Sequence, residues 1–128
     1  SDALRPWIYI WQDKEIERLR KINRLKEYAE SCYNHGLKCG DNQDFRSAVK
    51  FFNDALTYDP LNTNYLSIRA MAKCQIEDYK GALEDYDKVI ELYPTKKDIY
   101  LYRSRVKDLL GDWDGAESDR IRAKLVIK

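Results

Sequence analysis

The chain has few of the residues from which catalytic and metal sites are built. It contains one histidine and three cysteines among 128 residues. Nucleophilic catalysis needs a base within hydrogen-bond reach of the nucleophile, and His35 has no motif around it. The five glycines do not form a phosphate-binding loop. These scarcities predict a protein that is not an enzyme and that uses no cofactor or metal.

The three cysteines form an odd set and do not form a disulfide framework. Cys32 and Cys39 lie seven positions apart on one expected helix, which separates them by about two turns, or ~10 Å. That separation exceeds the reach of a disulfide. With Cys74, they are predicted to be reduced thiols that pack as small hydrophobic side chains. This use of cysteine favours a reducing, cytoplasmic compartment.

The chain also lacks an excess of one charge and a long apolar run. Its 23 basic and 22 acidic residues give a net charge of +1, so no global field attracts nucleic acid or a membrane. No stretch approaches the roughly 18 apolar residues of a membrane span, and no signal peptide is visible. The basic residues between positions 18 and 26 are flanked by Glu15, Glu17 and Glu27, which can pair with them at helical spacing. A solvated helix face is therefore expected there.

What the sequence does contain is a pattern that recurs every 34 positions. The first copy is Asp44, Phe45, Ala48, Phe52, Ala55 and Pro60; the second is Asp78, Tyr79, Ala82, Tyr86, Val89 and Pro94; the third is Asp112, Trp113, Ala116 and Ala123, with Arg120 at the second aromatic position. A unit this short cannot bury its apolar face alone, so the copies must stack on one another.

The spacing of apolar residues and the residues that begin and end helices assign the pattern to helices. Between residues 44 and 58 apolar side chains recur at three-and-four spacing, Asp44 is a probable N-terminal cap, and Asp59-Pro60 ends the helix. The same features predict helices near 62–75, 78–92, 96–109 and 112–127, and an earlier one that ends at Cys39-Gly40. Loops of a few residues require antiparallel neighbours.

Small side chains recur where the two helices of each unit are expected to cross. Gly36, Ala70 and Ser104 lie in the first helices, and Ala48, Ala82 and Ala116 lie in the second helices. Close approach of two helices is possible only where the side chains are short. The aromatic residues Phe45, Tyr79 and Trp113, with Phe52 and Tyr86, are predicted to fill the space between consecutive helices.

With this register the chain resembles the tetratricopeptide repeat family, whose units are 34-residue helix-turn-helix pairs. The matching stretches are DFRSAVKFFNDALTYDP, DYKGALEDYDKVIELYP and GDWDGAESDRIRAKL. The resemblance implies an all-α fold, a right-handed solenoid of three repeats at 29–62, 63–96 and 97–128, with an extended N-terminal helix. Two departures from the family pattern are Cys32, in place of its usual tryptophan, and Arg120.

The resemblance further implies a concave groove, lined by the first helix of each repeat, that binds a peptide or an amphipathic helix of another protein. The corresponding groove positions are Glu30, Tyr33, Asn34, Leu37, Asn64, Ser67, Ile68, Met71, Gln75, Asp98, Leu101, Tyr102 and Arg105. Family members that bind chaperone tails use a carboxylate clamp of lysines, asparagines and an arginine. The matching positions here are Tyr33, Leu37, Ile68, Asp98 and Tyr102, so chaperone-tail binding is not expected. Arg69, Arg103 and Arg105 are expected to be solvated or paired with acids such as Glu77 and Asp108.

Residues 1–28 lie outside the repeat and contain an aromatic run: Trp7, Ile8, Tyr9, Ile10 and Trp11. A helix over 13–38 is expected, whose first half projects or curls against this run. Three roles are open for the run: a cap folded on the first repeat, an insertion into its own or a neighbour's groove, or a segment that docks on a partner or a membrane. The apolar end formed by Leu125, Val126 and Ile127 is a second candidate for self-association.

The sequence therefore predicts a protein–protein interaction module that works as a scaffold or adaptor in the cytoplasm. The alternative is a self-associating scaffold, a homodimer formed through the aromatic run or the C-terminal end. A helical repeat that binds RNA is a rival of another class. It is disfavoured because the groove positions are heterogeneous and partly acidic, whereas RNA readout needs a repeated set of base-contacting residues.

Overall fold

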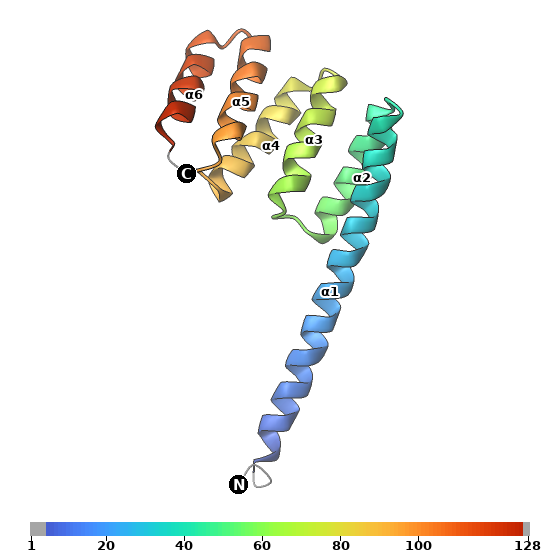
Figure 1. Cartoon of the computed structure of the whole chain (residues 1–128). Helices are drawn as coiled ribbons and strands as arrows, with labels where there is room; N and C mark the ends of the chain where they lie inside the picture. Colours follow the sequence, from blue (N-terminus) through green and yellow to red (C-terminus); the bar gives the residue numbers. More distant parts are fainter. Residues whose placement is uncertain (1–4, 127–128) are drawn as a thin grey trace.

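The fold is built from helices alone, as predicted. The computed structural model describes residues 5–126, and Figure 1 shows its helices stacked side by side, with the first reaching far beyond the others. The described residues form six helices and no strand: α1 (Pro6–Asp41), α2 (Phe45–Tyr58), α3 (Thr63–Gln75), α4 (Tyr79–Leu92), α5 (Lys97–Leu109) and α6 (Trp113–Leu125). Each contacts its neighbour in the chain. The predicted solenoid of helix pairs is confirmed.

The predicted aspartate caps lie at the N-terminus of the second helix of every pair. The carboxylates of Asp44, Asp78 and Asp112 accept hydrogen bonds from the backbone N–H three residues later, at 3.2, 3.0 and 3.0 Å. These contacts satisfy amide groups that have no partner within the helix. The 34-residue spacing of the three aspartates is therefore a spacing of helix starts.

The turn inside each pair uses a left-handed residue. Gln43, Glu77 and Gly111 have φ values of 62°, 61° and 80° and are 34 positions apart. The amide of the residue after each of them donates to a carbonyl of the last turn of the preceding helix, at 2.8 Å in all three cases. The turn in the first pair lies later than predicted. Gly40 remains helical, and α1 ends at Asp41 rather than at Cys39-Gly40.

The left-handed turn gives a testable difference between glycine and other residues. A side chain in this conformation costs roughly 1 kcal/mol, so Glu77→Gly should raise the free energy of unfolding by up to about 1 kcal/mol. Gly111→Ala should lower it by a similar amount, although no atom lies within 4 Å of the added Cβ. Urea unfolding of both variants measures the effect. Equal stability of Gly111→Ala and the parent chain would contradict it.

The small residues lie at the helix crossings, as predicted. Ala48, Ala70, Ala82 and Ala116 are fully buried, and Gly36 and Ser104 are buried on α1 and α5. Ala48 packs in one cluster with Phe52. Ala70 and Ala82 belong to the main core cluster, whose larger side chains include Leu56, Tyr65, Leu66, Tyr86, Val89, Ile99 and Val106. The repeat therefore brings the helix axes together where a side chain is short and fills the space beside the crossing with a large one.

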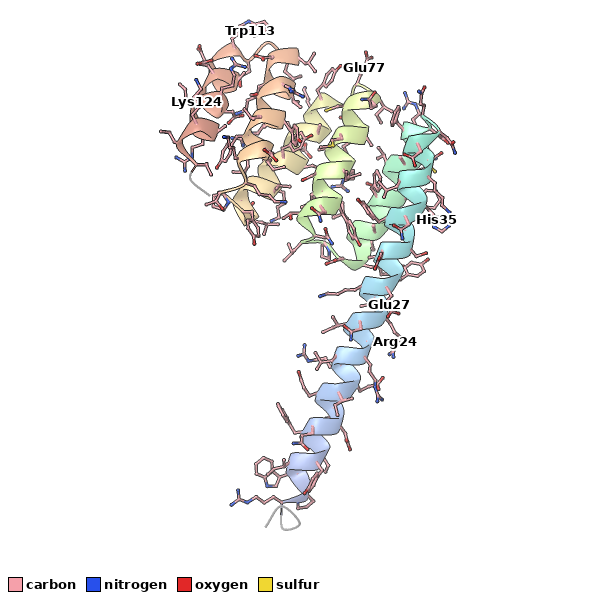
Figure 2. The ribbon with its side chains drawn as sticks, viewed as in Figure 1. Arg24, Glu27, His35, Glu77, Trp113 and Lys124 are labelled. Atoms are coloured by element: carbon pink, nitrogen blue, oxygen red, sulfur yellow. The ribbon has the colours of Figure 1, made fainter. Side chains whose placement is uncertain are left out.

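The aromatic residue of the third repeat, Trp113, does not fill the space between helices as predicted. Tyr79 packs on the main core cluster, whereas Trp113 is 66% exposed and stands at the far end of the stack (Figure 2). No helix follows α6 within the described residues, so no repeat covers the ring. Arg120 forms ion pairs with Asp108 and Glu117, both at 3.0 Å, in place of an aromatic contact.

The N-terminal half of α1 projects from the repeats, and the aromatic run forms its first turns (Figure 1). Trp7 and Trp11 are 66% and 62% exposed, and Ala29 is the first buried residue of α1. The predicted cap on the first repeat is therefore wrong, and so is insertion into the chain's own groove, because the run continues a straight helix. None of the described helices, α1 included, is long and apolar enough to span a membrane.

Candidate peptide-binding groove

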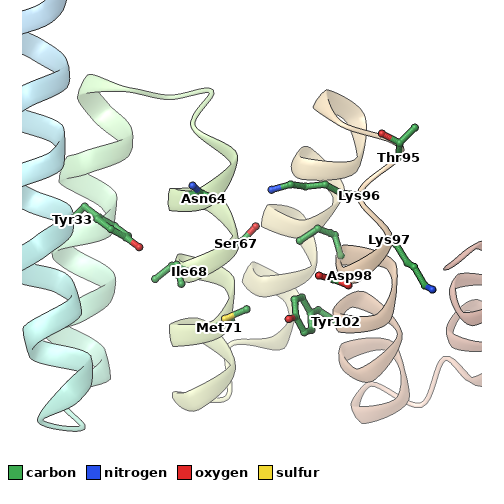
Figure 3. A pocket seen from close by; sticks show the side chains of 11 residues that line it. Tyr33, Asn64, Ser67, Ile68, Met71, Thr95, Lys96, Lys97, Asp98 and Tyr102 are labelled. Atoms are coloured by element: carbon green, nitrogen blue, oxygen red, sulfur yellow. The ribbon is translucent and has the colours of Figure 1, made fainter. Parts of the chain in front are cut away.

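A hollow of about 660 Å³ lies between α1, α3 and the start of α5 (Figure 3). It is lined by Tyr33, Asn64, Ser67, Ile68, Met71, Thr95, Lys96, Lys97, Asp98, Ile99 and Tyr102. We call this hollow the groove. Two turns of α3 form its centre, because Asn64, Ser67, Ile68 and Met71 are three or four positions apart and share one face of that helix.

The groove has an apolar floor whose aromatic side chains also belong to the core. The ring of Tyr33 stacks on Tyr65, with 4.7 Å between centroids, and lies 5.8 Å from Phe52. Tyr102 lies 6.2 Å from Tyr86. Ile68 is half-buried and Met71 is 36% exposed. The tyrosines are therefore fixed by packing, while Met71 is the adaptable apolar contact.

The predicted groove positions divide into three groups. Seven of them line the groove: Tyr33, Asn64, Ser67, Ile68, Met71, Asp98 and Tyr102. Leu37 and Gln75 line an adjoining hollow of about 200 Å³, which shares Ile68 and Met71 with the groove. Glu30, Asn34, Leu101 and Arg105 line neither hollow. Leu101 corresponds to Ser67 one repeat later, and it is 37% exposed because no further first helix covers it among the described residues.

Four lining residues were not predicted, and all lie where the chain enters α5. Thr95 and Lys96 precede the helix, and Lys97 and Ile99 lie in its first turn. Figure 3 shows Lys96 extending toward α3, whereas Lys97 points away from it. Pro94 was read only as the end of the preceding helix. Helix periodicity gives no signal for loop residues, so the cationic rim of the groove was missed.

Away from the groove, a buried ion network joins the two helices of the second repeat, and an equivalent network joins the two helices of the third. Asp85 is 3% exposed and pairs with Arg69 at 2.6 Å and Lys73 at 3.2 Å. The same set recurs 34 positions later. Asp119 is 3% exposed and pairs with Arg103 at 2.6 Å and Lys107 at 3.1 Å. The hydrogen bond to Asp119 is the main reason that the pKa of Arg103 is raised.

These networks change the interpretation of the buried aspartates and of the arginines that pair with them. Asp85 stands near Asp78 and Asp87 in the sequence, but unlike the cap Asp78 and the exposed Asp87 it is buried between α3 and α4. Arg69 pairs with Asp85 instead of Glu77, and Arg103 pairs with Asp119 and Asp87 instead of Asp108. Both arginines are therefore paired with acids of their own repeats, and neither lines the groove.

The first repeat has a version of the same contact that lacks the carboxylate. His35, Cys39 and Phe51 occupy the positions of Arg69, Lys73 and Asp85. The rings of His35 and Phe51 stack with 5.5 Å between centroids, and the His35 ring nitrogen Nδ1 lies 2.7 Å from the Ser31 carbonyl oxygen. Both contacts of the His35 ring are therefore packing and hydrogen-bond contacts within the first repeat.

The 34-residue stack matches a known family model. A model described as Tetratricopeptide repeat matches residues 29–60, which comprise the last third of α1, all of α2 and the start of the turn that follows. The chain belongs to the tetratricopeptide repeat family. It is a helical-repeat module of a protein–protein interaction fold.

The curated relatives of this tetratricopeptide repeat chain are much longer proteins. The TPR repeat-containing protein MJ1428 of Methanocaldococcus jannaschii is 33% identical over 100 residues, 74% of this chain and 16% of that protein. The STIP1 homolog of Dictyostelium discoideum is 33% identical over 84 residues, 66% of this chain and 15% of that protein. The chain thus spans about a sixth of the length of these relatives.

Solved structures show the same fold at lower identity. The second TPR domain of Spaghetti (RPAP3), bound to the HSP90 peptide SRMEEVD, has a TM-score of 0.73 and 22% identity, and the match covers 80% of this chain and 94% of that one. The Arabidopsis OM64 TPR domain has a TM-score of 0.74 and 22% identity, over 80% of this chain and 84% of that one.

The cysteines of the module have the free state predicted for them. Cys32, Cys39 and Cys74 are free and half-buried. Cys32 and Cys74 pack on the main core, and Cys39 packs on the smaller cluster around Phe52. Burial raises the pKa of the Cys74 thiol, which lowers its reactivity. No cluster of three potential metal ligands occurs among residues 5–126.

Proposed function

We propose that the groove binds a short amphipathic segment of another protein. The observation that carries the proposal is the apolar floor formed by Ile68, Met71 and Tyr102, which come from two successive first helices and face one hollow of about 660 Å³. Hollows of roughly 300–1,000 Å³ with a few polar groups are typical of binding sites. Apolar anchors spaced by one helical turn on the partner fit this floor.

The charges around the floor favour a partner with an acidic side chain. Lys96 reaches toward α3 at the rim (Figure 3), where its ammonium group can pair with a carboxylate. Asp98 lines the same hollow and repels a carboxylate placed deep inside it. The five clamp positions Tyr33, Leu37, Ile68, Asp98 and Tyr102 supply no cation. We therefore propose an internal segment with acidic residues rather than a chaperone tail. The RPAP3 domain, in contrast, is bound to the HSP90 peptide SRMEEVD.

In this proposal the chain is a non-catalytic adaptor module that acts in the cytoplasm. The half-buried free thiols support a reducing compartment. The acidic Asp98 in the groove and the pairing of Arg69 and Arg103 with buried acids outside it support a protein partner over RNA.

Selection from a random displayed peptide library provides the probe, and calorimetry measures the affinity of each selected peptide. We expect the peptides to share apolar residues three or four apart and an acidic residue. Met71→Glu should weaken their binding at least about tenfold, because it puts a charge on the floor. Leu101→Glu is the matched control. Leu101 has nearly the same exposure as Met71, 37% against 36%, but it lies outside the groove.

A second pair of variants tests the acidic component. Lys96→Glu should weaken acidic peptides, whereas Lys97→Glu should have the smaller effect, since Lys97 points away from α3 (Figure 3). Alanine at Tyr33 or Tyr102 is less informative because both rings pack on the core. Peptides that bind Met71→Glu as tightly as the parent chain, or that lose affinity equally for Leu101→Glu, would overturn the proposal.

A further inference from the structure

The projecting half of α1 continues the face that α2 covers in the first repeat. Side chains on that face recur with alternating spacings of three and four. Within the repeat they are Ala29, Cys32, Gly36 and Cys39, and before it they are Ile8, Trp11, Glu15, Arg18, Ile22 and Leu25. This is the heptad spacing of a helix that pairs with another helix. We call the earlier six positions the seam.

The seam is apolar at both ends and charged in the middle. Trp11 is 62% and Leu25 38% exposed, and Figure 2 shows the side chains of this half standing clear of the repeats. The two charged residues form an ion pair, with 3.1 Å between Arg18 Nε and Glu15 Oε2. The hydrogen bond to Arg18 lowers the pKa of Glu15, so both groups are ionised near pH 7.

We propose that a second copy of the chain covers the seam, with the two α1 helices antiparallel. A two-fold axis between positions 16 and 17 places Glu15 opposite Arg18 of the second copy, and Arg18 opposite its Glu15. The same axis places Trp11 opposite Ile22, and Ile8 opposite Leu25. Every apolar position of the seam meets an apolar one, and every charge meets its opposite, so one sequence is complementary to itself.

The charges also exclude the alternative orientation. In a parallel pair each position faces itself, so Glu15 would face Glu15 and Arg18 would face Arg18. Like charges at the centre of a helix pair disfavour that arrangement. Outside the seam, Leu19 flanks the contact, while Tyr9, Ile10 and Ile16 lie on other faces of the helix.

The seam occupies the part of the α1 face that α2 does not cover. The described part of α2 ends at Tyr58, whose ring lies 4.7 Å from Tyr28 of α1. In the antiparallel register Pro6, the first residue of α1, lies opposite Glu27 of the second copy. The partner helix therefore begins beside the end of α2, and the two cover consecutive parts of one face. The two repeat bodies lie at opposite ends of the pair, where neither obstructs the other.

Analytical ultracentrifugation of the full chain tests the proposal through charge reversal. We expect a dimer by about 100 µM. Glu15→Arg and Arg18→Glu should each weaken it at least about a hundredfold, because each creates two like-charge contacts. The double variant Glu15→Arg/Arg18→Glu, and an equimolar mixture of the two single variants, should restore it. Arg20→Glu and Glu27→Arg make the same charge changes on the opposite face of α1 and should leave the dimer intact.

If something other than a second antiparallel α1 covers the seam, these measurements should give different results. A chain that stays monomeric at about 100 µM overturns the proposal. A dimer that resists Glu15→Arg but dissociates with Leu125→Glu places the contact at the C-terminal end, where Leu125 is 67% exposed, and also overturns it. Monomers that bind phosphatidylcholine–phosphatidylserine vesicles, with Arg18→Glu and Arg20→Glu equally impaired, assign the helix to a membrane surface instead. All substituted residues of α1 are solvent-accessible, so circular dichroism should show an unchanged fold.

Discussion

Gly36→Ala should lower the free energy of unfolding by about 2 kcal/mol, although alanine is the better helix former. The added Cβ would lie 2.4 Å from a ring carbon of Phe52. Phe52 is 2% exposed and packs with Tyr33 and Ala48 in one cluster, so the ring cannot move without losing these contacts. Either α1 and α2 must separate or the ring must leave its position, and both lose packing. Chemical denaturation followed by circular dichroism measures the loss.

Gly40→Ala is the matched control for this prediction. Gly40 lies one turn later in α1, and no atom lies within 4 Å of its added Cβ. The substitution should therefore stabilise the chain by up to about 1 kcal/mol, through helix propensity alone. Phe52→Leu introduced into the Gly36→Ala variant should recover part of the loss by making room at the crossing. Equal effects at Gly36 and Gly40 would show that the crossing is not close-packed.

Asp85→Ala should destabilise the chain by about 2–4 kcal/mol, and Asp119→Ala should have a similar effect. Each substitution leaves two cations without their common carboxylate. The side chains of Arg69 and Lys73 are only 20% and 14% exposed, and those of Arg103 and Lys107 are each 17% exposed. Water cannot replace the lost contacts fully at such sites. Thermal and urea unfolding of the two variants measure the cost.

Asp87→Ala provides the control, since Asp87 pairs with Arg103 but its side chain is 55% exposed. Its removal should cost less than about 1 kcal/mol. The first repeat suggests a rescue, because His35, Cys39 and Phe51 fill the same positions with stacked rings and a small thiol. Asp85→Phe should therefore be less harmful when Arg69→His and Lys73→Cys accompany it. A triple variant no more stable than Asp85→Phe alone would contradict the equivalence of the two arrangements.

The sequence predicts the stack well because its strongest signals are local and repeated. The caps at Asp44, Asp78 and Asp112 and the small residues at the crossings each act within one helix pair, and a 34-residue register sets all of them together. The helix bounds therefore lie within two residues of the prediction at most ends. The exception is the start of α1, where the aromatic run looked like a separate element but follows Pro6 into the helix.

Other features depend on what lies next to a residue in space, and helix periodicity does not report this. Asp85 has two other acids near it in sequence and no periodic signal of its own, yet it is buried against Arg69 and Lys73. A 34-residue comparison would have shown that Arg, Lys and Asp recur together in the second and third repeats. Trp113 matched the aromatic pattern but has no covering helix among the described residues.

Only some of the expected groove positions line the hollow. The groove positions came from the family resemblance. Asn64, Ser67, Ile68 and Met71 on α3 line the hollow, whereas Leu101 and Arg105 on α5, implied in the same way, lie beyond it. Of the self-association residues, Leu125 is exposed and Val126 is half-buried, whereas Ile127 lies outside the described residues. Whether either end of the chain self-associates stays a prediction.

The methyl group of Met71 offers the most direct test of the groove, because Met71 is the only methionine of the sequence. It lines the hollow beside Ile68 and Tyr102. In a chain labelled with ¹³C-methyl methionine, a peptide selected for binding should shift or broaden this one resonance in proportion to the bound fraction, and Leu101→Glu should leave the response unchanged. A resonance that stays fixed while calorimetry shows the peptide to be bound would place the partner elsewhere and contradict the account.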